Sequence, residues 1–209
     1  MLRTDIVDQT AASEDILHPG SRALFRHWEA IRGENSAPRH AQLDLGRIRD
    51  LVPSLFLAEH SFRHGYIWRL AGTQVCDLWR RELTGTPIAT GWDRFERDTL
   101  ERLFDGVVRR HQPFILRFRL TSSLGHLIAA EMIGLPMLAR HVKMTHVLGA
   151  ILPFRGLSLL GYDAISRLEI QSARVIWTEP VPGGAPHVAA CSEKETYSPF
   201  EIIHGGREN

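Results

Sequence analysis

Three apolar segments follow one another closely in the second half of the chain, and their spacing restricts the fold more than any other feature. Residues 114–121 place an apolar side chain at every second position, as a strand with one buried face requires. A turn at 122–125 leads into two further strand-like segments, 126–137 and 145–154. Parallel neighbours would need crossovers of a dozen or more residues, so these three strands are predicted to pair antiparallel.

The first half of the chain adds two strands and several helices. Residues 55–59 and 66–70 are rich in aromatic and aliphatic side chains, and their short connection predicts a hairpin. A helical turn over 44–53 precedes the hairpin, and a brief helix around Val75 to Trp79 follows it. The clearest helix spans 93–110, with one apolar and one charged face. The predicted fold is therefore α+β, a five-stranded antiparallel sheet with helices on one face.

An additional amphipathic helix is predicted near the N-terminus. Ser21 can act as its N-cap and Gly33 ends it. Leu24, Phe25, Trp28 and Ile31 recur at three- and four-residue spacing, which places them on one helical face. This apolar stripe must be buried, either against a second subunit or against the chain's own sheet.

The chain divides into one domain and two ends. Residues 1–20 are mostly polar and aperiodic and predict a flexible lead-in, and 21–177 form the domain. Within it, 166–177 fits either a helix or another strand. Closely spaced prolines and glycines after Trp177 predict a flexible tail over 178–209.

Composition excludes several classes of partner. The 209 residues include 25 basic and 24 acidic side chains, a net charge of +1, which gives no electrostatic reason to expect nucleic acid or a membrane surface as a partner. No apolar run approaches the roughly 20 residues that cross a bilayer, and no secretory leader is evident, so we expect a cytoplasmic protein. Its two cysteines, Cys76 and Cys191, are expected to be reduced.

Several segments, taken in order, resemble the single-domain bacterial PAS branch of the PAS domain family over about residues 22–177. The segments are Arg-His-Trp-Glu-Ala-Ile-Arg-Gly (26–33), Leu-Val-Pro-Ser-Leu-Phe-Leu (51–57), Trp-Arg-Leu-Ala-Gly-Thr (68–73), Arg-Glu-Leu-Thr-Gly (81–85), Glu-Met-Ile-Gly-Leu-Pro-Met (131–137) and Val-Leu-Gly-Ala-Ile-Leu-Pro (147–153). The resemblance implies a curved antiparallel sheet that encloses an apolar cavity. It also implies signal reception or protein interaction, commonly through dimers, without an attached output domain.

Two sets of residues are candidates for function. The ligand-cavity candidates could instead be plain core; they are Trp79, Trp92, Phe95, Phe104, Phe118 and Glu131. Glu131 lies in an otherwise apolar strand, where an exposed strand position or a structural hydrogen bond explains a carboxylate more simply than a desolvated acid with a raised pKa does. The dimer-interface candidates are the stripe residues Leu24, Phe25, Trp28 and Ile31, because flanking helices of PAS proteins commonly pack against a second subunit.

No cofactor or metal is predicted. Cys76 lacks the Asn-Cys-Arg context of flavin photoreceptors, and His111, at the end of the long helix, fits a helix terminus better than a haem ligand. His60 and His64 lie in a strand and turn and read as solvated side chains.

Enzyme signatures are equally absent: no phosphate loop, nucleophile elbow or HExxH motif occurs. The leading hypothesis is thus a sensory or regulatory module, not an enzyme, that forms a homodimer and binds an unidentified signalling protein. One alternative is a receptor for an apolar small molecule. A second is a small α+β enzyme with an acid/base pair drawn from Asp77, His126 and Glu131.

Overall fold

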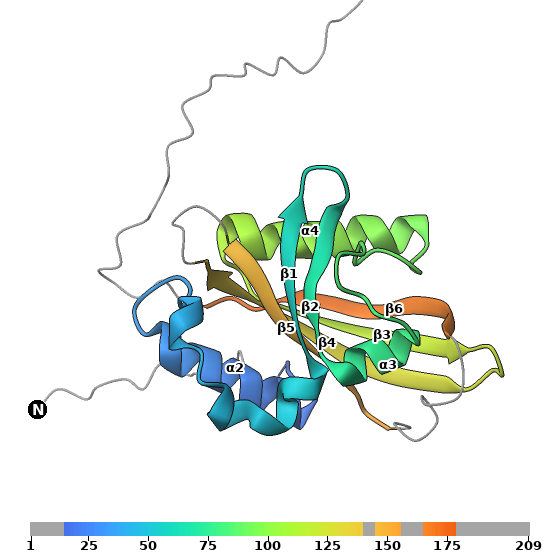
Figure 1. Ribbon diagram of the computed structural model, residues 1–209, viewed down its shortest axis with the longest axis horizontal. Helices are drawn as coiled ribbons and strands as arrows, with labels where there is room; N and C mark the ends of the chain where they lie inside the picture. The colour runs from blue at the N-terminus through green and yellow to red at the C-terminus, as the bar shows by residue number, and fades with distance from the viewer. Residues whose placement is uncertain (1–14, 140–144, 156–164, 179–209) are drawn as a thin grey trace, which may run out of the picture.

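The computed structural model describes residues 15–139, 145–155 and 165–178. A single antiparallel sheet of six strands, in the order β2-β1-β5-β4-β3-β6, forms its centre (Figure 1). The strands are β1 (Leu55–Ser61), β2 (Gly65–Ala71), β3 (Phe114–Ser122), β4 (Leu127–Leu138), β5 (Thr145–Pro153) and β6 (Ile165–Val175). The α+β class is confirmed.

The sixth strand comes from the segment for which the sequence allows a helix or a strand. β6 pairs with β3 from Ser122↔Ile165 to Phe114↔Val175 and becomes an edge of the sheet. Pairing on this side satisfies the outer backbone groups of β3, which a five-stranded sheet would leave open. The register shifts between Arg117 and Phe118, so that β6 bulges around Gln171.

The N-terminal helix α2 (Pro19–Arg32) begins earlier than predicted, because its N-cap lies three residues before Ser21, the predicted N-cap. His18 is its N-cap and accepts a hydrogen bond from the Gly20 amide at its Nδ1, 3.0 Å away. Pro19 fits the first helical position, where its fixed φ and missing N–H cost nothing. Residues 1–14 of the predicted lead-in lie outside the described part of the chain. Residues 179–209 of the predicted tail also lie outside it.

The remaining helices connect the strands. Two 3₁₀ segments, η1 (His40–Gln42) and η2 (Leu45–Ser54), precede β1. Helix α3 (Thr73–Trp79) follows β2, and α4 (Arg94–Arg110) precedes β3. Asp93 caps α4 by accepting from the Glu96 amide, and His111 ends it in the left-handed conformation.

Each face of the sheet carries its own apolar cluster. Helices α3 and α4 cover one face, which we call the inner face, as predicted. Helix α2 and η2 cover the opposite, outer face with a second cluster that includes Ile133 and Leu148. Because successive side chains of a strand alternate, the central strands serve both clusters and carry few polar residues.

Two glycines in the central strands make room for aromatic rings of the inner cluster. Gly134 and Gly149 are register partners in β4 and β5. A Cβ on Gly134 would lie 2.3 Å from Phe114 Cε1, and one on Gly149 would lie 2.2 Å from Phe56 Cζ. The two rings therefore lie directly on the backbone of a neighbouring strand, which only glycine permits.

We predict that Gly134→Ala lowers the free energy of unfolding by about 1–3 kcal/mol, because the Phe114 ring must move from a packed core. Urea denaturation measures this change. As a control, Gly106→Ala in α4 meets only the flexible end of Arg110, at 3.3 Å, and should gain up to about 1 kcal/mol of helix stability. Gly134→Ala should cost less in a Phe114→Leu background; an equal cost in both backgrounds would contradict the steric explanation.

Candidate functional site

The inner face of the sheet holds most of the residues predicted to line a ligand cavity. Trp92 and Phe118 are fully buried, with ring centroids 5.2 Å apart. Phe104 belongs to the same cluster and lies 5.3 Å from Phe114. Trp79 packs at its margin, with its ring 6.0 Å from Trp68. These four candidates are brought together, as members of a continuous aromatic core.

Two cavity candidates lie elsewhere. Phe95 is 77% exposed, because the buried face of α4 contains Glu96, Leu100 and Phe104, and the residue next to Glu96 points about 100° away from it. Glu131 is buried but on the outer face, since Ala130 and Met132 on either side of it belong to the inner cluster. Neither side chain therefore belongs to the inner cluster, where the ligand cavity was predicted.

Two hollows adjoin the helix α4. A small pocket between β2 and α4 has a volume of about 10 Å³, which is at the lower limit for one water molecule. A larger hollow of about 390 Å³ opens on the surface where α4 begins next to β6. Its lining consists of Gly91, Trp92, Asp93, Arg97, Ser166, Arg167 and Leu168.

Two polar atoms near this hollow are buried and have no hydrogen-bond partner among the described residues. They are Trp92 Nε1, a donor, and Glu96 Oε2, an acceptor. The other carboxylate oxygen of Glu96 accepts from the Ile170 amide, 2.8 Å away, at the β6 bulge. Because a buried polar atom without a partner is costly, these two atoms mark a place where a further polar group would be stabilised.

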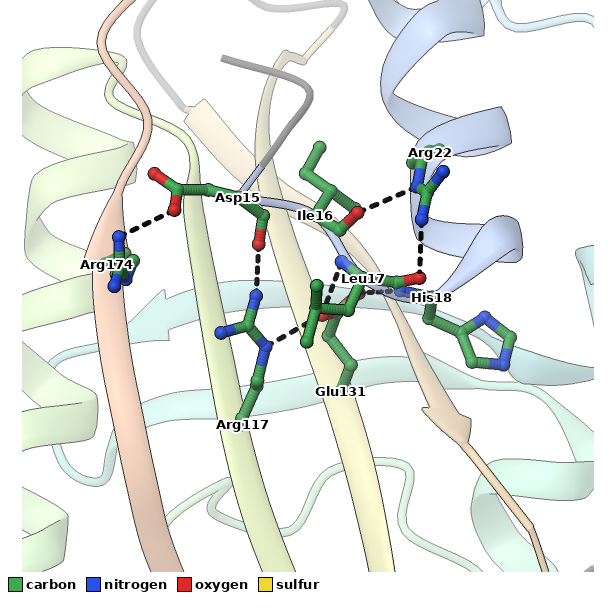
Figure 2. A network of polar contacts seen from close by, with 8 residues as sticks. All are labelled: Asp15, Ile16, Leu17, His18, Arg22, Arg117, Glu131 and Arg174. Atoms are coloured by element: carbon green, nitrogen blue, oxygen red, sulfur yellow. Dashed lines mark hydrogen bonds and ion pairs between the residues drawn. The ribbon is translucent and has the colours of Figure 1, made fainter. Parts of the chain in front are cut away.

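On the outer face, Glu131 forms the most enclosed polar site of the described structure (Figure 2). Its Oε2 accepts from the Leu17 amide at 3.1 Å, and its Oε1 accepts from the His18 amide at 2.9 Å. Arg117, directly opposite in β3, places Nε 3.2 Å from Oε2. A buried carboxylate is tolerated only when it is paired and hydrogen-bonded in this way.

The segment held by Glu131, residues 15–18, is here called the N-terminal strap. Arg117 Nη2 donates to the Asp15 carbonyl, and Arg174 of β6 bonds the Asp15 carboxylate at 2.6 Å (Figure 2). Arg22 of α2 donates to the carbonyls of Ile16 and Leu17. The strap is thereby attached to β4, β3 and β6 at once, and to the helix that follows it.

The stripe predicted to form a dimer interface lies against the chain's own sheet. Leu24, Phe25 and Trp28 are at most 1% exposed and belong to the outer cluster, whereas Ile31 is half-buried. Trp28 Nε1 also donates to the Pro136 carbonyl at 2.8 Å. The stripe folds back because the outer face of β4 and β5 is itself apolar and needs a cover, so Leu24, Phe25 and Trp28 are not available to a second subunit while the helix is docked.

The residues considered for an acid/base pair are not assembled. Asp77 is exposed on α3, and His126 is exposed at the turn before β4. His126 and Glu131 are five strand residues apart, about 16 Å. Glu131 is fully engaged by Arg117 and the strap amides.

Side chains considered for cofactors have structural contacts. Burial lowers the pKa of His111, and its ring nitrogens lie 2.7 Å from Ser36 Oγ and 3.2 Å from Thr145 Oγ1. Cys76 is half-buried, and burial raises the pKa of its thiol, which lies 3.8 Å from the Ala71 carbonyl.

Among the described helices, none is both long and apolar enough to cross a membrane.

Sequence reasoning missed the strap and the Arg117–Glu131 pair. One signal was present for the pair: a turn centred on residues 123–125 places Arg117 opposite Glu131 in an antiparallel hairpin. No periodic pattern marks residues 15–18, because their contacts with Glu131 and Arg117 use backbone groups and only Ile16 contributes a buried side chain.

Comparison with known families agrees with this architecture. A family model described as PAS domain matches residues 16–152, from the strap to the end of the central strands. No curated protein matches the chain.

The partial burial of His18 predicts that the stability of the folded domain depends on pH. Burial lowers the pKa of His18 below its ordinary value of 6.5, and the nearby Glu131 carboxylate opposes this shift. The neutral ring is therefore favoured in the folded state, and its contribution to stability is present above pH 6.5 and lost as the pH falls through the lowered value.

We predict that His18→Asn, which keeps an N-cap acceptor, reduces the stability lost between pH 7 and pH 5. Urea denaturation at both pH values measures the loss. His64→Asn, at an exposed turn, should leave the loss unchanged. If His18→Asn and wild type lose the same free energy, His18 does not sense pH.

Proposed function

The chain belongs to the PAS domain family, whose members are sensory and signalling modules, and we propose that it regulates a protein partner through helix α2. PAS domains are generally sensory rather than catalytic, and we propose no reaction for this chain. The observation that carries the proposal is the buried Glu131 carboxylate, which binds the strap immediately before α2.

Helix α2 covers a surface that would bind protein if it were uncovered. Beneath it lie Ile133, Leu135 and Leu148, which are all buried in the outer cluster. Contiguous exposed apolar surface of this kind marks interaction sites. The released helix would present Leu24, Phe25 and Trp28 as an apolar face, the form in which amphipathic helices enter grooves of partner proteins.

The inner core and the strap share the same two strands, which gives a physical route between them. In β3, Phe118 contacts Trp92 on the inner face, while its neighbour Arg117 pairs with Glu131 on the outer face. In β4, Met132 belongs to the inner cluster, next to Glu131. We propose that a displacement of the inner aromatic side chains shifts these strands and weakens the Glu131 contacts, so that α2 detaches.

We predict that Glu131→Gln frees α2. The substitution leaves the half-buried Arg117 without its charge partner and puts an amide N–H against a strap amide. Breaking a fully buried pair costs about 3–5 kcal/mol, and because Arg117 is 19% exposed we expect a cost at or below the lower end of that range. Hydrogen exchange should therefore speed up at the amides of residues 19–32 while β5 stays protected, and sedimentation should detect association through the uncovered surface.

Glu169→Gln is the matched control, because Glu169 forms a partly exposed pair with Arg167 at 2.8 Å and its loss should cost at most about 1 kcal/mol. If Glu131→Gln unfolds the domain, Arg117→Lys offers a milder loss of the same contact. Exchange in α2 that matches wild type in a folded Glu131 or Arg117 variant would overturn the proposal.

A second candidate function, reception of a small molecule, is supported by the hollow beside α4. Its lining joins the apolar side chains of Trp92 and Leu168 to the charged groups of Arg97 and Arg167. The unpartnered Trp92 Nε1 and Glu96 Oε2 lie next to it along the chain. We propose a ligand with an apolar body and one polar group that satisfies the Trp92 donor.

For this candidate, native mass spectrometry of the purified protein should show a bound small molecule. Trp92→Phe removes the indole N–H and keeps an aromatic ring, so ligand affinity should fall about tenfold. Trp177→Phe, at a side chain that is 78% exposed, should leave the affinity unchanged. Protein without added mass would argue against reception.

A further inference from the structure

A pair of histidines on the outer face lies far apart in sequence and in contact in space. His40 Nε2 is 3.0 Å from His146 Nδ1, and the two ring centroids are 4.9 Å apart. His40 belongs to η1, which follows α2, and His146 lies near the start of β5. Because 106 residues separate them, no local sequence spacing reveals the pair.

Three elements hold the pair in place. The end of β4 fixes η1, since the Leu138 amide donates to the Pro38 carbonyl at 2.8 Å. Behind His146, Glu59 of β1 places Oε2 3.6 Å from Nε2. Arg69 of β2 in turn orients Glu59 through a 2.6 Å contact. Two ring nitrogens therefore face each other, with a carboxylate on the far side of one ring.

We propose that His40 and His146 bind one divalent transition-metal ion of the copper(II) or nickel(II) class. Imidazole nitrogens lie about 2.0–2.1 Å from such an ion, so a 3.0 Å separation corresponds to an N–metal–N angle of about 95°. Tetrahedral zinc would need nitrogens about 3.3 Å apart. An angle near 90° between neighbouring ligands is the square-planar or tetragonal geometry that copper(II) and nickel(II) prefer.

The carboxylate behind His146 suits the use of this ring as a metal ligand. Glu59 favours the proton on Nε2 of His146, which leaves the Nδ1 lone pair for the ion. His40 then carries its proton on Nε2 in the hydrogen bond between the rings. When the ion binds, this proton moves through solvent to Nδ1 of the same ring, so that both facing nitrogens can bind the ion.

Among residues 15–139, 145–155 and 165–178, no group of three His, Cys, Asp or Glu side chains is arranged to hold a metal ion, so the proposed site has two protein ligands within this part of the chain. A site with two protein ligands is expected to bind its ion more weakly than a closed structural site with four. The ion would fasten η1 to β5, at the opposite end of α2 from the strap. This inference does not depend on the proposed function.

Calorimetric titration of the full chain with copper(II) or nickel(II) chloride tests the proposal. We expect one ion per chain for wild type, at least tenfold weaker binding for His40→Asn and for His146→Asn, and unchanged binding for His64→Asn, an exposed turn histidine. Electron paramagnetic resonance of the copper complex should show two imidazole nitrogens in wild type and one in His40→Asn.

A further variant keeps both ligands and so guards against misfolding of the histidine variants. Glu59→Gln removes only the carboxylate behind His146 and should weaken the binding by about tenfold. The proposal is overturned if wild type binds neither ion, or if folded His40 and His146 variants both bind as wild type does. The pair would then be a hydrogen bond alone.

Discussion

The arrangement of the outer face depends on one buried carboxylate. Glu131 lies in a strand whose neighbouring positions are apolar, and it can remain there only because Arg117 and two strap amides satisfy it. In return, it fixes where the chain enters helix α2. The helix then covers apolar side chains of β4 and β5 that water would otherwise contact. The need of the buried Glu131 carboxylate for hydrogen-bond donors thus determines where α2 lies on the apolar outer face of the sheet.

The central strands of the sheet are buried on both sides and therefore connect its two faces physically. Alternation places neighbours such as Phe118 and Arg117 in different environments, one in the aromatic core and one beside the strap. Packed interiors respond to a displaced side chain by moving neighbours rather than by compressing. A sensory role fits this construction, since the inner cluster and helix α2 share β4 and β5 as their common support.

Local patterns predicted the fold more completely than the site. The helices around 19–32 and 94–110 and the strands of the hairpin and of the second half follow from periodicity and turn residues. The placement of Phe104 and Phe118 in one core also follows from their helical and strand faces, whereas Trp92 joins them from the loop before α4. Long-range contacts such as Glu131 with Leu17 or His40 with His146 depend on register and on irregular backbone, which no local pattern encodes. Periodicity can also fail within a helix. Phe95 was predicted to line the cavity but is exposed, because adjacent helical residues point about 100° apart and its neighbour Glu96 faces the core.

The course of the strap also has a mechanical consequence. Its contacts come in chain order, with Asp15 bound by β3 and β6, and Leu17 and His18 bound by β4. A force applied to the N-terminal end would load these bonds one after another, as in peeling, and not all at once, as in shear. Helix α2 would therefore separate from the sheet at low force, while the strands beneath it, whose ladders share the load, would remain paired.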